Sequence, residues 1–230
     1  MRMRSAALAV LFLSLAAVSR ADFTRGRQSL ALFGGFGGTS SQYDYQPGDR
    51  STVTGAGGAF GAQYFYYLTG SPAIAIGADL TSSLNANAHD DSLLSGYDAT
   101  ARMRSFVGLL TGRLSYPRGL LRPYLFAGIG AHHSRQQLTA QPQSGVAWPG
   151  GGTDARVLID DDETSAAFAG GIGLDIFLRD SFFVGAELRS VWLVGLNTDD
   201  NAAIRAAGFR VDEKQGVDQG NVFLRAGVVF

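Results

Sequence analysis

Residues 221–230 read NVFLRAGVVF and alternate between two kinds of side chain. Because the side chains of a β-strand point to opposite faces in turn, one face of this stretch is wholly apolar and the other carries Arg225. A soluble sheet would bury the apolar face, but other stretches of the chain repeat the pattern and no helical stretch is available to cover them. The pattern therefore predicts a strand with lipid outside and a polar lumen inside.

The first residues have the pattern of an export signal. Arg2 and Arg4 precede the apolar run 6–18, and the residues Ser19-Arg20-Ala21 form a small-x-small cleavage site. We expect residues 1–21 to be a signal peptide and residues 22–230 to form one domain. The apolar run is shorter than the roughly 20 residues that a membrane-spanning helix needs, so no helical anchor is expected.

The composition excludes several classes of function. The chain has no cysteine, which rules out disulfides, thiol chemistry and cysteine-ligated zinc. Loss of the three arginines of the signal peptide leaves 16 basic residues against 20 acidic ones, a net charge of about −4. Nucleic acid is therefore not an expected partner. The glycine-rich residues 34–38 do not form a phosphate loop, because no helix follows them, and no cofactor or metal is expected.

Eight stretches share the alternating pattern of the last one, and long polar connections alternate with short turns between them. The unpaired edges of a sheet cannot be satisfied in lipid, so an even-stranded antiparallel sheet with apolar outer faces has to close on itself. The sequence predicts an all-β, eight-stranded antiparallel up-and-down transmembrane barrel. Short turns and both termini are expected in the periplasm and long loops outside. The predicted strands are residues 28–38, 52–68, 73–84, 101–116, 122–134, 164–178, 182–196 and 221–230.

The strand number is open by one hairpin. Residues 135–163 are the longest predicted connection, and their outer parts either extend the neighbouring strands or form an extra pair. Ten strands are the structural alternative.

Several features occur together: a signal sequence, eight predicted strands, alternating long and short connections, the RPYLFAGIG stretch at 122–130 and the terminal VVF. In this combination the chain resembles the OmpA-type family of small outer-membrane barrels. The resemblance implies an integral protein of the Gram-negative outer membrane. It also implies that Phe230 is the carboxy-terminal aromatic residue recognised by the outer-membrane assembly machinery. The chain ends at the eighth predicted strand, so we expect no peptidoglycan-binding domain.

Six charged residues are predicted on the inner faces of the strands. A barrel of eight strands has an interior just wide enough for side chains, where an isolated charge would be costly, so the three acids should pair with the three arginines. One interpretation is a structural plug in place of an apolar core. The other is a gate whose ion pairs exchange partners to open a narrow conductance. The six residues are Asp79, Arg113, Asp175, Glu187, Arg189 and Arg225.

His132, His133 and Ser134 lie at the outer end of the fifth predicted strand. The spacing of His132 and Ser134 is similar to that of outer-membrane lipid A deacylase barrels, and the resemblance implies a histidine base and a serine nucleophile. Arg135 departs from the asparagine usual in that family, and no glutamate occurs before Glu163. A polar strand end at the level of the lipid headgroups is the interpretation we favour.

Charged residues near the outer rim offer two further hypotheses. The acidic run 160–163, with Asp154 nearby, could hold calcium through carboxylate oxygens, although its spacing does not match an EF-hand loop and a solvated loop is favoured. Similar acidic pairs occur at 90–91 and 199–200. Arg102 and Arg104, two residues apart on one face, are candidates for contacts with lipopolysaccharide phosphates.

Together these features predict a non-enzymatic, monomeric barrel of the cell envelope, with a structural or surface-interaction role through its long loops and a lumen plugged by ion pairs. The expected partners are outer-membrane lipid, lipopolysaccharide and, through the last strand, the assembly machinery. A narrow, porin-like channel is the alternative function, and a lipid A deacylase is a weaker one. Neither the ligands of the loops nor the conductance of the lumen follows from the sequence.

Overall fold

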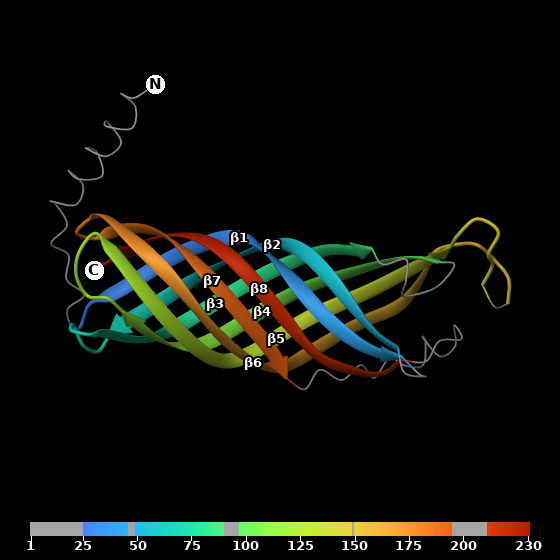
Figure 1. Cartoon of the computed structure of the whole chain (residues 1–230), viewed down its shortest axis with the longest axis horizontal. Coiled ribbons are helices and arrows are strands. Elements are labelled where there is room, and N and C mark those ends of the chain that lie inside the picture. Colours follow the sequence, from blue (N-terminus) through green and yellow to red (C-terminus); the bar gives the residue numbers. More distant parts are fainter. Residues whose placement is uncertain (1–24, 46–48, 90–96, 149, 195–210) are drawn as a thin grey trace, which may run out of the picture.

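The computed structural model of the protein describes residues 25–45, 49–89, 97–148, 150–194 and 211–230. Within them the chain forms a closed antiparallel barrel in which each strand pairs with its neighbours in sequence (Figure 1). This confirms the predicted fold. The strands are β1 (Gln28–Tyr45), β2 (Asp49–Tyr67), β3 (Ala73–His89), β4 (Tyr97–Ser115), β5 (Leu121–Pro142), β6 (Arg156–Arg179), β7 (Phe182–Val194) and β8 (Val211–Val229).

The stretch 221–230 is the closing strand of the barrel. It lies within and just beyond β8 and pairs with β1, so that Ser29 is opposite Val229 and Phe33 is opposite Arg225. Two backbone hydrogen bonds join the outermost residues, from Gln28 N to Phe230 O (2.8 Å) and from Phe230 N to Gln28 O (2.9 Å). The seam removes both free edges, as a sheet in lipid requires.

The two faces of the strands are divided as predicted. Large apolar side chains cover the outside, where Leu224 is 72% and Leu110 is 68% exposed. The inside holds charged, hydroxyl and aromatic side chains, most of them buried. Because this division follows the two-residue period of the strands through the whole barrel, it fixes which side chains meet in the lumen.

Seven of the eight strands are longer than predicted, and the connections predicted at 39–51, 85–100 and 197–220 are wrong in part. The outer parts of 135–163 extend β5 and β6, which is one of the two outcomes predicted for them. Residues 39–45, 49–51, 85–89, 97–100, 135–142, 156–163 and 211–220 are strand. These segments are mostly polar and lack the long apolar face that marks a strand in lipid. Beyond the bilayer a strand needs only backbone pairing, and water can cover both of its faces, so the apolar alternation stops before the strand does.

The alternative with ten strands is wrong. Residues 135–142 and 156–163 continue β5 and β6 as one long hairpin. Its pairing runs from Leu121 opposite Ile176 to Ala140 opposite Arg156. In Figure 1 this hairpin projects past the other strands at the end opposite the short turns.

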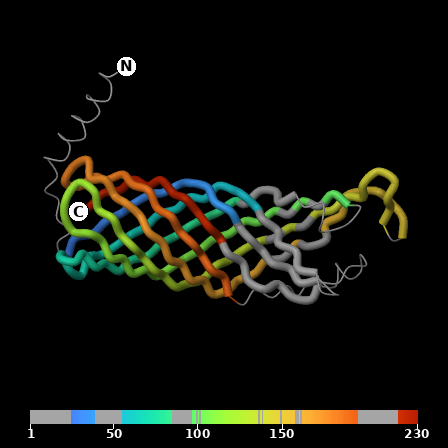
Figure 2. Tube along the Cα trace, viewed as in Figure 1, coloured from blue at the N-terminus to red at the C-terminus, as the bar shows by residue number. Residues whose placement is uncertain are grey.

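The end of β8 lies beside the start of β1 and the short turns, and the trace in Figure 2 follows the tilted strands from there to the opposite end. No helix in the described ranges has the length and hydropathy needed to cross a bilayer. The predicted signal peptide, residues 1–21, and the acidic pairs at 90–91 and 199–200 lie outside the described residues.

Candidate functional site

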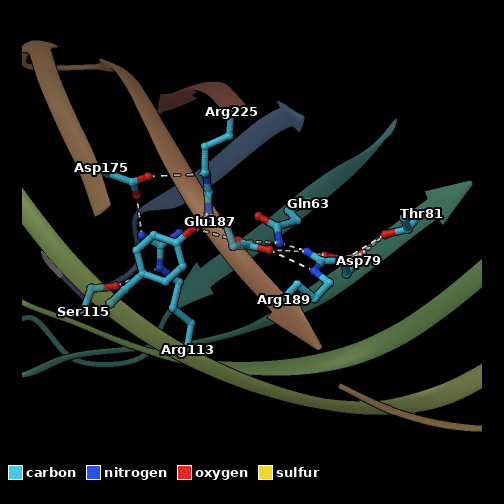
Figure 3. Close-up of polar contacts among 10 residues, drawn as sticks. Gln63, Asp79, Thr81, Arg113, Ser115, Asp175, Glu187, Arg189 and Arg225 are labelled. Carbon is cyan, nitrogen blue, oxygen red and sulfur yellow. Dashed lines mark hydrogen bonds and ion pairs between the residues drawn. The ribbon is translucent and has the colours of Figure 1, made fainter. Parts of the chain in front are cut away.

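The six charged residues predicted on the inner faces all point into the lumen, from five different strands (Figure 3). Each is nearly inaccessible to solvent. Their exposed fractions are 0% for Asp79, 2% for Arg113, 0% for Asp175, 3% for Glu187, 2% for Arg189 and 4% for Arg225. We call these six residues the lumen network.

The outer half of the network is centred on Arg189 of β7. Its guanidinium donates to both carboxylate oxygens of Asp79 (2.9 and 2.6 Å) and to Oε1 of Glu187 (2.6 and 2.9 Å). Thr81 Oγ1 accepts a further bond at 2.8 Å. Gln63 on β2 donates through Nε2 to Asp79 at 2.7 Å and to Glu187 at 3.3 Å. Two carboxylates from separate strands are thus held by one arginine and one amide.

The inner half, toward the short turns, is centred on Asp175 of β6. Arg113 on β4 forms a direct ion pair with Oδ2 of Asp175, and both side chains are fully buried. The Nε of Arg113 donates to Ser115 Oγ at 2.8 Å. Arg113 faces inward on β4 and is buried.

Arg225 joins the two halves. Its Nε lies 3.3 Å from Oδ1 of Asp175, and its Nη1 lies 3.1 Å from Oε2 of Glu187. The same Nη1 donates to the hydroxyl of Tyr124, which itself donates to Glu187 Oε2 at 2.7 Å. The sequence offered three acids as partners of Arg225; the structure pairs it with Asp175 and Glu187.

Aromatic rings enclose the guanidinium groups. Arg189 lies over Phe33, Phe126 and Phe223 at 4.9 to 5.1 Å, and Arg113 lies 3.7 Å from the centroid of Tyr124. A ring face attracts a cation and does so more strongly where water is excluded. The rings therefore lower the cost of burying the arginines without adding charge.

The analysis of the sequence missed three members of the site. Gln63 and Tyr124 bond directly to the network, and the fully buried Arg122 stacks 3.9 Å from the Phe177 ring while donating to Gly119 O at 3.0 Å. A signal was present, because Arg122 and Tyr124 share the inward parity of β5. Alternation places both side chains inward, but it does not show which inward side chains reach the buried charges.

The network provides complementary charge and does not resemble a reaction centre. The lumen network sets three carboxylates among three guanidinium groups, and Arg122 adds a fourth buried guanidinium group to the barrel interior. Removing one partner from such a buried set leaves the others uncompensated, which is far more costly than the net contribution of the pair. The arrangement can hold the strands in one register, and its side chains fill the lumen at the level where they lie.

His132 and Ser134 also face the lumen and are fully buried, whereas His133 faces outward and shares a 3.1 Å hydrogen bond with Thr164 Oγ1. In the β5–β6 register Ser134 lies opposite Glu163. The predicted strand end at 132–134 is wrong, because β5 continues to Pro142.

The charged residues at the outer rim lie on strands. Arg102 and Arg104 are exposed on β4, and Arg135 on β5 donates two 3.0 Å hydrogen bonds to Asp160. The predicted acidic loop at 160–163 is wrong, because these residues continue β6. Among the described residues no group of three or more acidic or histidine side chains is arranged to hold a metal ion. Phe230 is 58% exposed, and its assembly role stays a prediction.

A closed antiparallel barrel with an apolar outer surface and a charged, buried interior defines the class of integral outer-membrane β-barrel proteins. The sequence matches the outer membrane protein beta-barrel domain family over residues 5–214, and the chain belongs to this family. It is an integral protein of the Gram-negative outer membrane. No curated protein matches the sequence.

Solved structures with a similar course of the chain share little sequence with it. Ail, the attachment invasion locus protein of Yersinia pestis, is 14% identical, with 90% of this chain and 100% of that chain covered and a TM-score of 0.42. OprG of Pseudomonas aeruginosa is 14% identical, with 91% and 99% covered and a TM-score of 0.45. The amino-terminal barrel of Pseudomonas aeruginosa OprF is 15% identical, with 90% and 100% covered and a TM-score of 0.41.

Proposed function

We propose that the protein is a structural and surface-interaction barrel whose lumen is closed by its own side chains. The observation that carries this proposal is the lumen network, in which Arg225 connects carboxylates from β6 and β7 across the interior. An eight-stranded barrel is only wide enough for side chains to fill, so a cross-linked layer of buried charges obstructs ion flow.

The β5–β6 hairpin supports a role at the cell surface. Near its tip Trp148 is buried against Tyr97, with ring centroids 4.6 Å apart, and its Nε1 donates to Asp154 O at 2.8 Å. Arg156 covers the ring of Trp148 at 5.1 Å. A tip that is held by its own contacts presents a fixed surface at the end of a long projection, as a binding element requires.

We propose further that the protein is not an enzyme. In a lipid A deacylase the nucleophile must meet an acyl chain from the bilayer, but Ser134 and His132 are buried on the lumen side of the sheet. The wall of the barrel separates them from the lipid, which argues against a role as nucleophile and base.

Planar-bilayer recording tests the closed lumen. We expect purified wild-type protein to give no discrete conductance steps above the background of the bare membrane. Glu187→Ala and Arg225→Ala should each give brief, small openings, because each removes a link between the two halves of the network. Arg118→Ala, an exposed turn residue, is the matched control and should remain silent. Each variant is first checked for heat-modifiable gel migration, which reports a folded barrel.

A narrow channel is the second candidate, and a property of Arg225 favours it. In the described part of the chain its Nη2 has no hydrogen-bond partner, so it retains a donor with which to exchange carboxylates. Long-lived wild-type openings that change in Glu187→Ala would replace the closed-lumen proposal with the channel.

A further inference from the structure

The outer surface of β4 and β5 carries a basic patch just beyond the apolar band. Arg104 on β4 lies directly opposite Arg135 on β5, and both side chains are exposed on the outward face. Arg102 is two residues farther along the same face of β4. We call these three residues the rim arginines.

The pairing of Arg104 with Arg135 places two like charges side by side, and Asp160 compensates only the charge of Arg135. Like charges directly opposite each other on one face of an antiparallel pair destabilise it, because their Cβ atoms are only about 5 Å apart. Among the described residues Arg104 and Arg102 form no ion pair with a carboxylate. An anion placed between Arg104 and Arg135 would turn this repulsion into two favourable contacts.

Two carboxylates share this face of the barrel. Asp160 accepts both hydrogen bonds from Arg135, and these bonds hold the pKa of Asp160 below the usual carboxyl value. Asp162, exposed on β6, lies opposite Arg135. Their position on the β6 side leaves the β4 side of the patch positive, so the anion site lies over Arg102 and Arg104, with Arg135 at its edge.

The position of the patch identifies the kind of anion. On the same face the next residues toward the membrane are Phe106 and His133, and beyond them the band continues with Leu110 and Ile129. Arg104 is two residues, about 7 Å of strand, beyond Phe106. Aromatic residues mark the boundary of the apolar band in such barrels, so the rim arginines lie at the depth of lipid headgroups.

We propose that the rim arginines bind a phosphate group of an outer-leaflet glycolipid, the phosphorylated lipid A portion of lipopolysaccharide. Arginine presents a planar fork of donors that matches phosphate oxygens and forms paired hydrogen bonds with them. The acyl chains of the bound lipid lie along the exposed apolar surface of Phe106 and Ile129 below the patch, with Leu84 of β3 beside Arg104. The site is independent of whether the lumen conducts.

Equilibrium binding of fluorescent, diphosphorylated lipid A to the purified barrel in detergent micelles tests this proposal. Replacing both Arg104 and Arg135 by glutamine should weaken the apparent Kd at least tenfold, whereas Arg118→Gln with Arg179→Gln should leave it within twofold. The control pair removes the same charge from exposed positions at the opposite end of the barrel. Dephosphorylated lipid A should bind the wild type as weakly as the phosphorylated form binds the double variant.

A single variant keeps the test valid if the double variant does not fold. Arg104→Gln relieves the repulsion from Arg135, so its urea midpoint in lipid-free micelles should equal or exceed that of the wild type, while its lipid A affinity falls several-fold. Arg104→Lys should retain only part of the affinity, because lysine keeps the charge but lacks the planar fork. Inorganic phosphate at millimolar concentration should not displace lipid A, because it lacks the acyl contacts. Unchanged affinity in Arg104→Gln, equal binding of dephosphorylated lipid A, or full displacement by inorganic phosphate would each overturn the proposal.

Discussion

Replacing Arg189 by leucine is expected to lower the free energy of unfolding by about 3 to 5 kcal/mol. The guanidinium of Arg189 donates to Asp79, Glu187 and Thr81, and the two carboxylates are almost fully buried. Without it both carboxylates remain in the lumen with only part of their compensation, and Gln63 can supply a single amide group to them.

Reversible urea unfolding in lipid vesicles, followed by tryptophan fluorescence, measures this effect. Adding Asp79→Asn to Arg189→Leu should recover part of the loss, because it removes one uncompensated charge. Arg118→Leu at an exposed turn is the control and should stay within about 0.5 kcal/mol of the wild type. A loss below 1 kcal/mol in Arg189→Leu would mean that water reaches the network and replaces the arginine.

The second large effect concerns the lipid-facing surface. Ile172, on the outward face of β6, is 61% exposed and lies near the middle of the apolar stretch between Phe168 and Leu178. Replacing it by arginine should cost about 2 to 4 kcal/mol, because a charge at the midplane of the bilayer loses its hydration. The same substitution at Thr164, eight residues along the same face, should cost about 0 to 1 kcal/mol.

The two variants are compared by urea unfolding in bilayers of one lipid composition. Both positions are outward and exposed on one strand, so the main difference between the variants is the depth of the new charge. Thr164→Arg also removes the hydrogen bond shared with His133. Equal costs at Ile172 and Thr164 would contradict the assignment of the membrane band on β6.

The sequence determined the architecture because its signals are local. Alternation in stretches such as 221–230 identified the strands and their faces, and the need to close the sheet in lipid gave the pairing of β8 with β1. The ends of the strands could not be found in this way. Residues 135–142 and 156–163 carry polar residues on both faces and only short apolar runs, so their pairing with each other, rather than their alternation, identifies them as strand.

The sequence predicted which charged residues face the lumen better than it predicted which of them pair. Face parity placed six charged residues in the lumen, but which acid meets which arginine depends on strand stagger and tilt. Arg225 and Asp79 share a lumen and yet Arg225 pairs with Asp175 and Glu187. The contribution of Tyr124 and of the rings around Arg189 could not be predicted either. An inward aromatic residue that contacts a buried charge has the same sequence pattern as one that only fills space.

The central claim is that the lumen arginines are held in buried ion pairs away from water. Nuclear magnetic resonance of the barrel with ¹⁵N-labelled arginine, in micelles at mildly alkaline pH, tests it through exchange of the guanidinium Nε–H protons with solvent. Arg113, Arg189 and Arg225 should give resolved Nε–H signals that exchange slowly, while the exposed Arg118 and Arg179 exchange too fast to be observed. Fast exchange of all three lumen arginines would show a hydrated, open interior and contradict the account.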